Sequence, residues 1–306
     1  MRALVTGGAG YIGSVVSNHL LDEGHEVIII DNLSTGMIDN IPKKAEFLKL
    51  DIADTKKLNK IFLKKKIDIV FHFAAFINNE ESLKYPKKYF KNNFEKGKIF
   101  LENCIKNNIN KFIYSSTAAV YGNKKSQVTE KDKLNPMSPY PKSKLKLEKF
   151  LMNKKKNISC VILRYFNVAG ADTKLRCGFN VKKGYNLILN LCAASLKKKI
   201  FKINGNNYKT KDGTTIRDYI HVQDLARIHL LAANQVLNKK IFKIFNCGYG
   251  NGFSVMEILK KFNSMSNRKI KFKIGKRRDS DIIISIADPK ELVKFTKWKP
   301  KFNNLS

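Results

Sequence analysis

Tyr140 and Lys144 are the two residues whose types and spacing most clearly suggest chemistry. They stand four residues apart at the start of an expected helix, after the turn Asn135–Pro139, so their side chains share one helix face. A tyrosine acts as a base only after losing its proton, and moving its pKa from ~10 to ~7 takes about 4 kcal/mol. A neighbouring ammonium group supplies part of that stabilisation. The pair therefore predicts a tyrosine base, although in a lysine-rich chain the same spacing also arises by chance on a solvated face.

Hydroxyl side chains follow the expected strand 111–116, at Ser115, Ser116 and Thr117. The carboxyl ends of parallel strands form the edge at which ligands bind in such sheets. We therefore expect a hydroxyl group here to converge with Tyr140, and Thr117 to hydrogen-bond a substrate hydroxyl as it becomes a ketone.

Residues 2–13 read as a short apolar strand, a glycine turn and the start of an amphipathic helix. Gly7 permits the tight turn, Gly10 lets the backbone approach a pyrophosphate, and Gly13 lets the helix lie close to the strand. The strand before the turn and the helix after it separate this motif from an ordinary surface turn. We therefore expect a dinucleotide to bind with its pyrophosphate at this turn.

The expected strand 26–30 ends at Asp31, about 20 residues past the glycines. An acidic residue at this position accepts hydrogen bonds from the adenosine ribose hydroxyls and repels a 2′-phosphate, so we expect NAD rather than NADP. The nicotinamide cation would then add to the effect of Lys144 on the tyrosine. Asp51 and Ile52 end the next strand, where a carboxylate could meet the adenine amine, but a solvated turn explains Asp51 nearly as well.

Strands and helices alternate along the first half of the chain, which is typical of an α/β fold with a doubly wound parallel (Rossmann) sheet. Further strands are expected at 46–50, 67–73 and 159–166, and helices at 12–23, 55–66, 87–108 and 140–155. From about 171 the pattern changes to a loop, a helix near 186–198 and Gly/Asn turns, which predicts a smaller C-terminal α/β lobe. We expect an NAD-binding domain of residues 1–170 plus roughly 215–247, and a substrate-binding lobe of residues 171–214 and 248–306.

The net charge of +34 is the one unusual feature of the composition. It raises nucleic-acid binding as a rival function. Only eight of the 59 basic residues are arginine, which sequence-reading proteins favour, and the lysines are scattered. The excess of Lys, Asn, Ile and Phe also fits a codon bias, so we expect no specific nucleic-acid partner.

The five cysteines are widely spaced and odd in number, so neither a disulfide framework nor a metal site is expected. No apolar run reaches the ~20 residues of a membrane helix, and the first residues lack a signal-peptide pattern. We therefore expect a cytoplasmic protein with no membrane partner.

Beyond these motifs, the chain resembles the extended short-chain dehydrogenase/reductase family and, within it, the UDP-glucose 4-epimerases. The matching stretches follow one another along nearly the whole chain. They are Gly7–Gly13, Asp31–Ser34, Phe73–Ala75, Asn92–Asn93, Ser115–Thr117, Val120–Gly122, Tyr140–Lys144, Leu163–Ala171, Asp212–Thr214, Arg217–Val222 and Asn246–Gly248. The last few belong to the sugar-nucleotide side of the family and are more specific than the glycine turn.

The resemblance implies that NAD-dependent oxidation at sugar C4, rotation of the 4-keto sugar and hydride return interconvert UDP-glucose and UDP-galactose. It implies Tyr140 as the base, Lys144 as its partner and nicotinamide-ribose ligand, and Thr117 as the assisting hydroxyl. The implied cofactor contacts are Gly7, Gly10, Tyr11, Ile12, Asp31, Asn32, Asp51, Ile52, Phe73, Ala74, Ala75 and Asn93, and we add Gly13 and Ser115 from the motifs above. The implied UDP-sugar contacts are Thr117, Tyr140, Asn167, Asn186, Leu187, Arg217, Tyr219, Arg278 and Asp281. A homodimer built on the helices near 87–108 and 140–155 is also implied.

Three positions bear on the details of this resemblance. Glu80 stands where the family often has glycine in Val-Gly-Glu-Ser, which places extra charge near the cofactor pyrophosphate. Ser285 matches a position where a bulky tyrosine restricts the sugar to glucose and galactose, so serine suggests room for N-acetyl groups. Ala118 follows Thr117 where the related 4,6-dehydratases carry an acid, which argues against that rival reaction.

Overall fold

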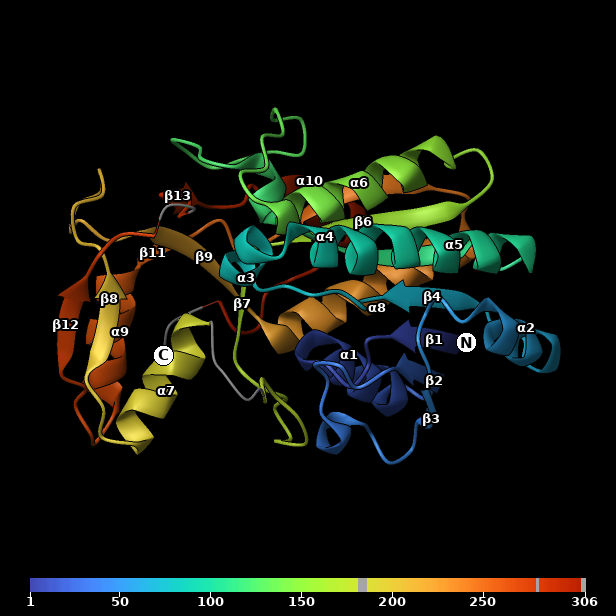
Figure 1. Ribbon diagram of the computed structural model, residues 1–306, viewed down its shortest axis with the longest axis horizontal. Coiled ribbons are helices and arrows are strands. Elements are labelled where there is room, and N and C mark those ends of the chain that lie inside the picture. Colours follow the sequence, from blue (N-terminus) through green and yellow to red (C-terminus); the bar gives the residue numbers. More distant parts are fainter. Residues whose placement is uncertain (181–185, 279–280, 304–306) are drawn as a thin grey trace.

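The large sheet of the protein holds seven parallel strands in the order β10-β6-β5-β4-β1-β2-β3, as seen in the computed structural model (Figure 1). The structure describes residues 1–180, 186–278 and 281–303. The strands are β1 (Arg2–Thr6), β2 (Glu26–Asp31), β3 (Glu46–Lys49), β4 (Ile69–His72), β5 (Lys111–Thr117), β6 (Ser159–Tyr165) and β10 (Phe242–Cys247). The expected doubly wound sheet is therefore confirmed. Its strand order reverses between β1 and β4, where such sheets form a ligand-binding crevice.

The side chains of each strand alternate between the two faces of this sheet. Both faces carry apolar side chains, and helices cover both of them. Ala3 and Val5 of β1 belong to the core formed with α1 (Tyr11–Asp22), α8 (Val222–Asn238) and α10 (Lys290–Thr296). Leu4 belongs to the opposite core, formed with α2 (Thr55–Lys64), α5 (Gly97–Lys106) and α6 (Pro139–Asn153). Burial on both faces explains why the strands are almost continuously apolar in sequence.

The helix expected at 87–108 consists of α4 (Pro86–Tyr89), a π-helix, η2 (Phe90–Lys96), and α5. Its π-helical turns bring the buried Asn93 to the segment that follows β4. The Asn93 side chain accepts from Phe76 N (2.8 Å) and donates to Phe76 O (2.9 Å) and to Ser143 Oγ (3.1 Å). Asn93 therefore ties this segment, which leads into α3 (Asn79–Lys84), to the helix that carries Tyr140.

A smaller lobe lies beside the large sheet, at the left of Figure 1. In it β9 (Ile216–His221) pairs with β7 (Asn167–Ala169), β11 (Gly252–Ser254) and β13 (Ile284–Ser285), and β8 (Phe201–Asn204) pairs with β12 (Phe272–Gly275). The helices α7 (Leu187–Leu196) and α9 (Val255–Met265) pack there around Leu191, Phe201 and Leu259. The expected smaller C-terminal α/β lobe is confirmed. Two short 3-10 helices, η1 (Ile38–Asn40) and η3 (Ala118–Tyr121), complete the elements.

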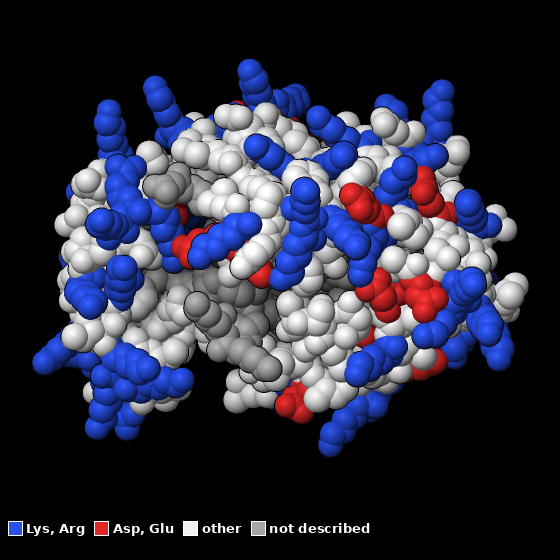
Figure 2. Space-filling model, viewed as in Figure 1, with Lys and Arg blue, Asp and Glu red and all other residues white. Residues whose placement is uncertain are grey.

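Lysine and arginine side chains are spread over the whole face shown in Figure 2 rather than gathered in one patch. All five cysteines are free thiols. Among the residues that the structure describes, no helix combines the length and apolarity needed to span a bilayer. Within the same residues, no group of His, Cys, Asp and Glu side chains could hold a metal ion.

Candidate active site

A cavity of about 670 Å³, which we call the cofactor cavity, opens at the carboxyl ends of β1, β2 and β4. It lies where the strand order reverses, as expected for a dinucleotide site. All the sequence-predicted cofactor residues line it except Asn93 and Lys144. The lining predicted residues are Gly7, Gly10, Tyr11, Ile12, Gly13, Asp31, Asn32, Asp51, Ile52, Phe73, Ala74, Ala75 and Ser115.

Two glycines of the turn lie too close to neighbouring backbone atoms to carry a side chain. Gly7 has a φ of +73°, and a Cβ on it would lie 2.7 Å from Ala74 N. A Cβ on Gly13 would lie 2.3 Å from Gly7 O, so helix and turn are in direct contact. Gly10 precedes α1 and has no side chain to cap it, which leaves the first N–H groups of the helix for an anion. These features fit the pyrophosphate of a dinucleotide.

Asp31 holds a carboxylate in a fixed orientation at the end of β2. One oxygen accepts from Leu33 N at 2.8 Å and the other from Ala9 N at 3.1 Å. Burial raises the pKa of Asp31, and these two hydrogen bonds oppose that rise. A buried carboxylate with remaining acceptor capacity fits the two hydroxyls of an adenosine ribose.

Asp51 also lines the cofactor cavity, but its carboxylate already has protein partners. It accepts from Lys96 Nζ at 2.5 Å and from Asn32 Nδ2 at 3.1 Å. Burial acts to raise the pKa of Asp51, but the hydrogen bonds, led by that from Lys96, bring it below its usual value. An adenine amine at Asp51 would therefore share the carboxylate with Lys96.

Tyr140 and Lys144 lie in the first two turns of α6, which begins at Pro139, a residue whose fixed φ suits a first helical position. Lys144 is only 2% exposed, and its ammonium nitrogen lies 4.6 Å from the centroid of the Tyr114 ring. Burial lowers the pKa of Lys144 to about 7, although the Glu148 carboxylate opposes this shift. The Tyr140 ring meets Tyr89 edge-on, with ring centroids 6.5 Å apart. The expected pair thus combines a tyrosine with a deeply buried amine.

The hydroxyl groups at the end of β5 point in two directions because side chains alternate along a strand. Ser116 donates to the fully buried Glu148, whose carboxylate is also bound by Arg164 at 2.8 Å. Ser115 lines the cofactor cavity. Thr117, two residues further on, accepts from Ala119 N at 3.2 Å, so its own proton remains available for another acceptor.

A second cavity, of about 140 Å³, lies in the smaller lobe, and we call it the lobe cavity. It brings together residues from β7, α7, β9 and the segment after β12. The predicted substrate residues that line it are Asn167, Leu187, Arg217, Tyr219, Arg278 and Asp281. Asn190, Phe201, Lys202, Ile203, Asn204, Gly205, Thr214, Thr215 and Val255, which we did not predict, also contribute to it.

Asn186 is a predicted substrate residue that does not line the lobe cavity. Its side-chain oxygen accepts from Ile188 N at 2.9 Å and caps α7, and its amide nitrogen donates to Val168 O at 2.9 Å. An asparagine directly before an apolar helical run is a recognised cap signal, so this position was readable from sequence.

The two arginines of the lobe cavity differ in their partners. Arg217 donates to Ile216 O at 2.9 Å and to Ile283 O at 3.2 Å, and burial lowers its pKa. Arg278 forms an ion pair with Glu80 of α3 at 2.5 Å. The Glu80 position that departs from the family pattern therefore faces a predicted substrate arginine, and not only the cofactor side as we expected.

Several further contributors carried no motif in the sequence. Phe179 and Asn180 line the cofactor cavity from the segment after β7. Tyr208 donates to the Asp281 carboxylate at 2.7 Å and lies under the guanidinium of Arg277, 4.0 Å from its ring centroid. These residues are brought to the site by long-range packing, so no local pattern could have found them.

Comparisons with known proteins agree with this geometry. The model of the NAD dependent epimerase/dehydratase family matches residues 3–248. The chain is 38% identical over 310 residues to a UDP-glucose 4-epimerase of Lactobacillus helveticus, covering 100% of this chain and 94% of that protein.

Solved structures give the same result. A UDP-glucose-4-epimerase of Stenotrophomonas maltophila, with bound NAD and formylated UDP-arabinopyranose, superimposes with a TM-score of 0.95 at 32% identity, covering 100% of this chain and 94% of that one. The UDP-Glc/GlcNAc 4-epimerase of Campylobacter jejuni superimposes with a TM-score of 0.85 at 37% identity, covering 99% of this chain and 95% of that one.

Proposed function

The chain belongs to the NAD-dependent epimerase/dehydratase family, and we propose that it interconverts UDP-glucose and UDP-galactose at carbon 4 of the sugar. The observation that carries this proposal is the combination of the two sites. The chain has the Tyr140–Lys144 pair and a cavity suited to a dinucleotide. A separate cavity holds two arginines suited to a diphosphate. Full-length relatives that carry the name UDP-glucose 4-epimerase support the same reaction.

NAD is the cofactor, and when bound it supplies the site that accepts a hydride from sugar C4 and returns it. The glycine turn would hold its pyrophosphate and Asp31 its adenosine ribose, with Asp51, Ile52 and Phe73–Ala75 along the same wall. Ser115 would meet the cofactor from β5, and Lys144 would bind the nicotinamide ribose. Asn93 would act through the Phe76 segment that it fixes.

Tyr140 is the proposed base: it removes the proton of the C4 hydroxyl and returns it to the C4 oxygen after the 4-keto sugar has rotated. Lys144 stabilises the tyrosinate because an ammonium beside a phenol lowers its pKa. Thr117 hydrogen-bonds the C4 oxygen, since its hydroxyl proton is left available by the contact with Ala119. Removing such a base costs on the order of 10²–10⁴ in rate.

The UDP end of the substrate is the proposed anchor, which leaves the sugar free to rotate. Arg217 and Arg278 would bind the diphosphate with paired N–H donors, as guanidinium groups do. The other proposed contacts are Asn167, Asn186, Leu187, Tyr219 and Asp281. Asn186 would contribute mainly by starting α7, because both ends of its amide have protein partners.

The test is conversion of UDP-galactose to UDP-glucose by the purified protein and by its Tyr140→Phe variant. We expect turnover by the wild type and a loss of at least about 100-fold in the variant. Tyr85→Phe is the matched control, because Tyr85 is 58% exposed and its hydroxyl has no proposed role. No conversion by the wild type, or full conversion by Tyr140→Phe, would contradict the proposal.

A wider substrate range follows from Ser285. This residue lies in β13, beside Arg217 in the neighbouring strand, and is partly exposed. Its small side chain supports acceptance of UDP-N-acetylhexosamines as well. The UDP-Glc/GlcNAc 4-epimerase of Campylobacter jejuni is 37% identical to this chain, which supports the same breadth.

The division of labour between the two parts of the chain is also proposed here. Residues 1–170 and roughly 215–247 would form the NAD-binding domain, and residues 171–214 and 248–306 the substrate-binding lobe. β9 lies at their boundary, because it pairs with β7 of the first part and with β11 and β13 of the second. Separate binding of NAD to a fragment lacking the lobe would support this division, and an unfolded fragment would argue against it.

A homodimer that pairs α5 and α6 with the same helices of a second copy completes the proposed assembly. Ile99 on α5 and Met152 on α6 are apolar side chains that are 41% and 43% exposed, and a second copy paired there would cover them. Light scattering should give a mass of twice 35.0 kDa, and a single-chain mass would rule the dimer out.

The remaining proposals concern surroundings rather than chemistry. Free thiols suit a reducing compartment, which supports a cytoplasmic location that a fluorescent fusion can test.

The scattered lysines support the absence of a specific nucleic-acid partner. Retention of one preferred nucleic acid in a filter-binding assay at physiological salt would overturn that view.

A further inference from the structure

Residues 170–180, which we call the strap, leave the end of β7, pass over α1 and reach the cofactor cavity. At the far end Phe179 and Asn180 form part of the cavity wall. The Phe179 ring stacks on that of Tyr11, the first residue of α1, with centroids 4.9 Å apart and planes inclined by 26°. The strap therefore forms a wall of the cofactor cavity that is separate in sequence from the glycine turn.

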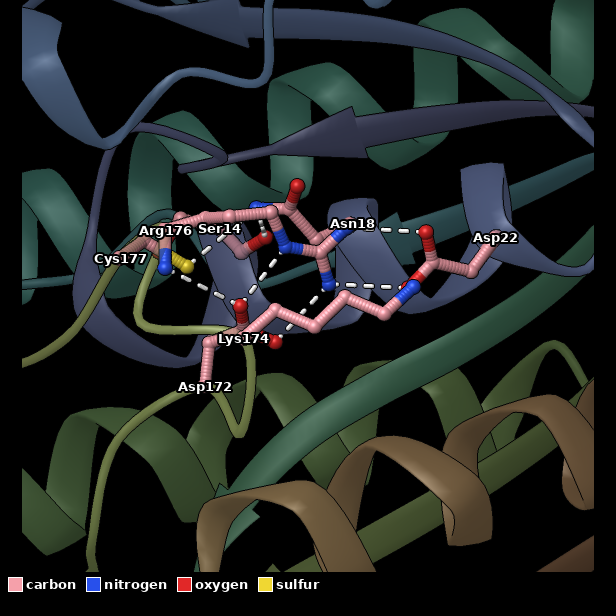
Figure 3. Close-up of polar contacts among 7 residues, drawn as sticks. All are labelled: Ser14, Asn18, Asp22, Asp172, Lys174, Arg176 and Cys177. Atoms are coloured by element: carbon pink, nitrogen blue, oxygen red, sulfur yellow. Dashed lines mark hydrogen bonds and ion pairs between the residues drawn. The ribbon is translucent and has the colours of Figure 1, made fainter.

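Arg176 fastens the middle of the strap by binding two carboxylates at once (Figure 3). Its two terminal nitrogens donate to the two oxygens of Asp22, both at 2.9 Å. Its Nε and one terminal nitrogen also donate to the two oxygens of Asp172, at 2.7 and 2.9 Å. Asp22 is the last residue of α1, and Asp172 is a strap residue whose side chain is fully buried. One guanidinium thus joins the strap to the helix that follows the glycine turn.

Weaker contacts hold the strap to α1 on both sides of Arg176. Tyr11 donates from its hydroxyl to Gly170 O at 2.6 Å, and Asn18 donates to the sulfur of Cys177 at 3.3 Å. Within the strap, Asp172 N donates to Cys177 O at 3.1 Å and closes the intervening residues into a loop. The loop between these points is thus fixed internally, and Arg176 is its main charged connection to α1.

We propose that Arg176 is a positioning residue that fastens the strap to α1 and thereby retains NAD in the cofactor cavity from one turnover to the next. This proposal rests on the proposed function, because an epimerase recovers its NAD in every cycle and gains nothing from releasing it. No residue of the strap lines the lobe cavity, so exchange of a UDP-sugar bound there would not require the strap to move. The same connection would be a disadvantage in a dehydrogenase, which must exchange its cofactor.

The neighbouring Lys174 offers a matched control. It also binds Asp22, at 3.1 Å, but through a single contact and with 62% of its side chain exposed. An exposed single contact of this kind contributes little. Arg176 is 31% exposed and makes bidentate contacts, the stronger type of ion pair.

The test measures the release of NAD from purified holoenzyme of the wild type and of Arg176→Met, Arg176→Lys and Lys174→Met. Released NAD is trapped by alcohol dehydrogenase with excess ethanol, and the absorbance at 340 nm is followed. We expect NAD to leave Arg176→Met at least about tenfold faster than it leaves the wild type. The loss of one hydrogen bond to a charged group corresponds to roughly a tenfold change or more. Arg176→Lys should release NAD at an intermediate rate, because lysine keeps the positive charge but lacks the planar guanidinium that binds two oxygens at once. Lys174→Met should stay within about twofold of the wild type.

A second measurement separates this positioning role from general stability. The thermal midpoint of each variant is taken without NAD and with saturating NAD. We expect Arg176→Met to lower the midpoint of the NAD-free protein, because the buried Asp172 carboxylate loses its cation, and to lower the midpoint with NAD by more, because part of the rise that NAD produces is also lost. Release at the wild-type rate, or an equal fall of both midpoints, would overturn the proposal. Because neither readout needs UDP-sugar turnover, failure of the epimerase assay would be seen separately.

Discussion

Lys144→Met is expected to make the NAD-free protein more stable while it removes the activity. Burial lowers the pKa of Lys144 from 10.5 to about 7. In the unfolded chain this lysine keeps its proton up to pH ~10.5, so between those values the unfolded state binds more protons and stability increases with pH. At about 1.4 kcal/mol per pH unit, holding Lys144 in the folded protein costs about 4 kcal/mol at pH 7.

Methionine keeps most of the apolar stem and lacks the amine, so this cost disappears. The variant also loses the contact of the ammonium with the Tyr114 ring, which is worth about 1 kcal/mol. We therefore expect Lys144→Met to raise the free energy of unfolding by about 3 kcal/mol at pH 7. The gain should shrink by about 1.4 kcal/mol per pH unit as the pH rises towards 10.

Urea unfolding of the NAD-free wild type and variant, at several values between pH 7 and pH 9.5, measures both quantities. Epimerase activity of Lys144→Met should fall by at least about 100-fold, because the proposed base loses its cationic neighbour. The reasoning is refuted if the variant is no more stable than the wild type at pH 7. A stability difference that stays constant across this pH range would refute it equally, because burial of a titrating amine must give a slope.

Two further predictions concern the substrate side. Glu80→Gln should bind UDP about two- to fivefold more tightly by calorimetry, because a diphosphate at Arg278 no longer displaces a partly exposed ion pair worth up to about 1 kcal/mol. Glu95→Gln, a change on the exposed side of the π-helix, is the control, and unchanged or weaker binding by Glu80→Gln would contradict the prediction. Ser285→Tyr should lower turnover of UDP-N-acetylglucosamine by at least about tenfold and leave turnover of UDP-glucose within about threefold. Equal effects on both substrates would show that position 285 does not select the sugar.

The parts of the fold that were predicted from sequence have causes within a few residues. Strands such as β2 were found because burial on both faces makes parallel strands continuously apolar. The glycine turn was found because Gly7 and Gly13 have no room for a Cβ. The first helix was expected to end at residue 23, and Gly24 directly after it has a φ of +76°, which favours glycine. In each case local sterics dictate the residue type.

The features that sequence reasoning missed depend on contacts between distant segments. Asp22 and Arg176 lie 154 positions apart, and neither belongs to a motif. Glu80 was recognised as unusual, but its partner Arg278 became apparent only when α3 and the lobe were brought together. The π-helix within the expected helix 87–108 has no periodicity signal of its own, and the contact of its Asn93 with Phe76 joins segments that are 17 residues apart.

The separation of the two cavities gives the fold a way to treat its two ligands differently. None of the residues that the structure describes lines both of them, and the cofactor cavity is walled by the large sheet, α1 and the strap. The lobe cavity is walled by short strands, by α7 and by Arg278, which forms an ion pair with the exposed Glu80. We expect a ligand held by the buried Asp31 carboxylate and a fastened strap to leave more slowly than one held at a solvent-facing ion pair. Because epimerisation consumes no NAD, this difference in exchange is what the reaction requires, and Arg176 and Glu80 are the residues at which it can be measured.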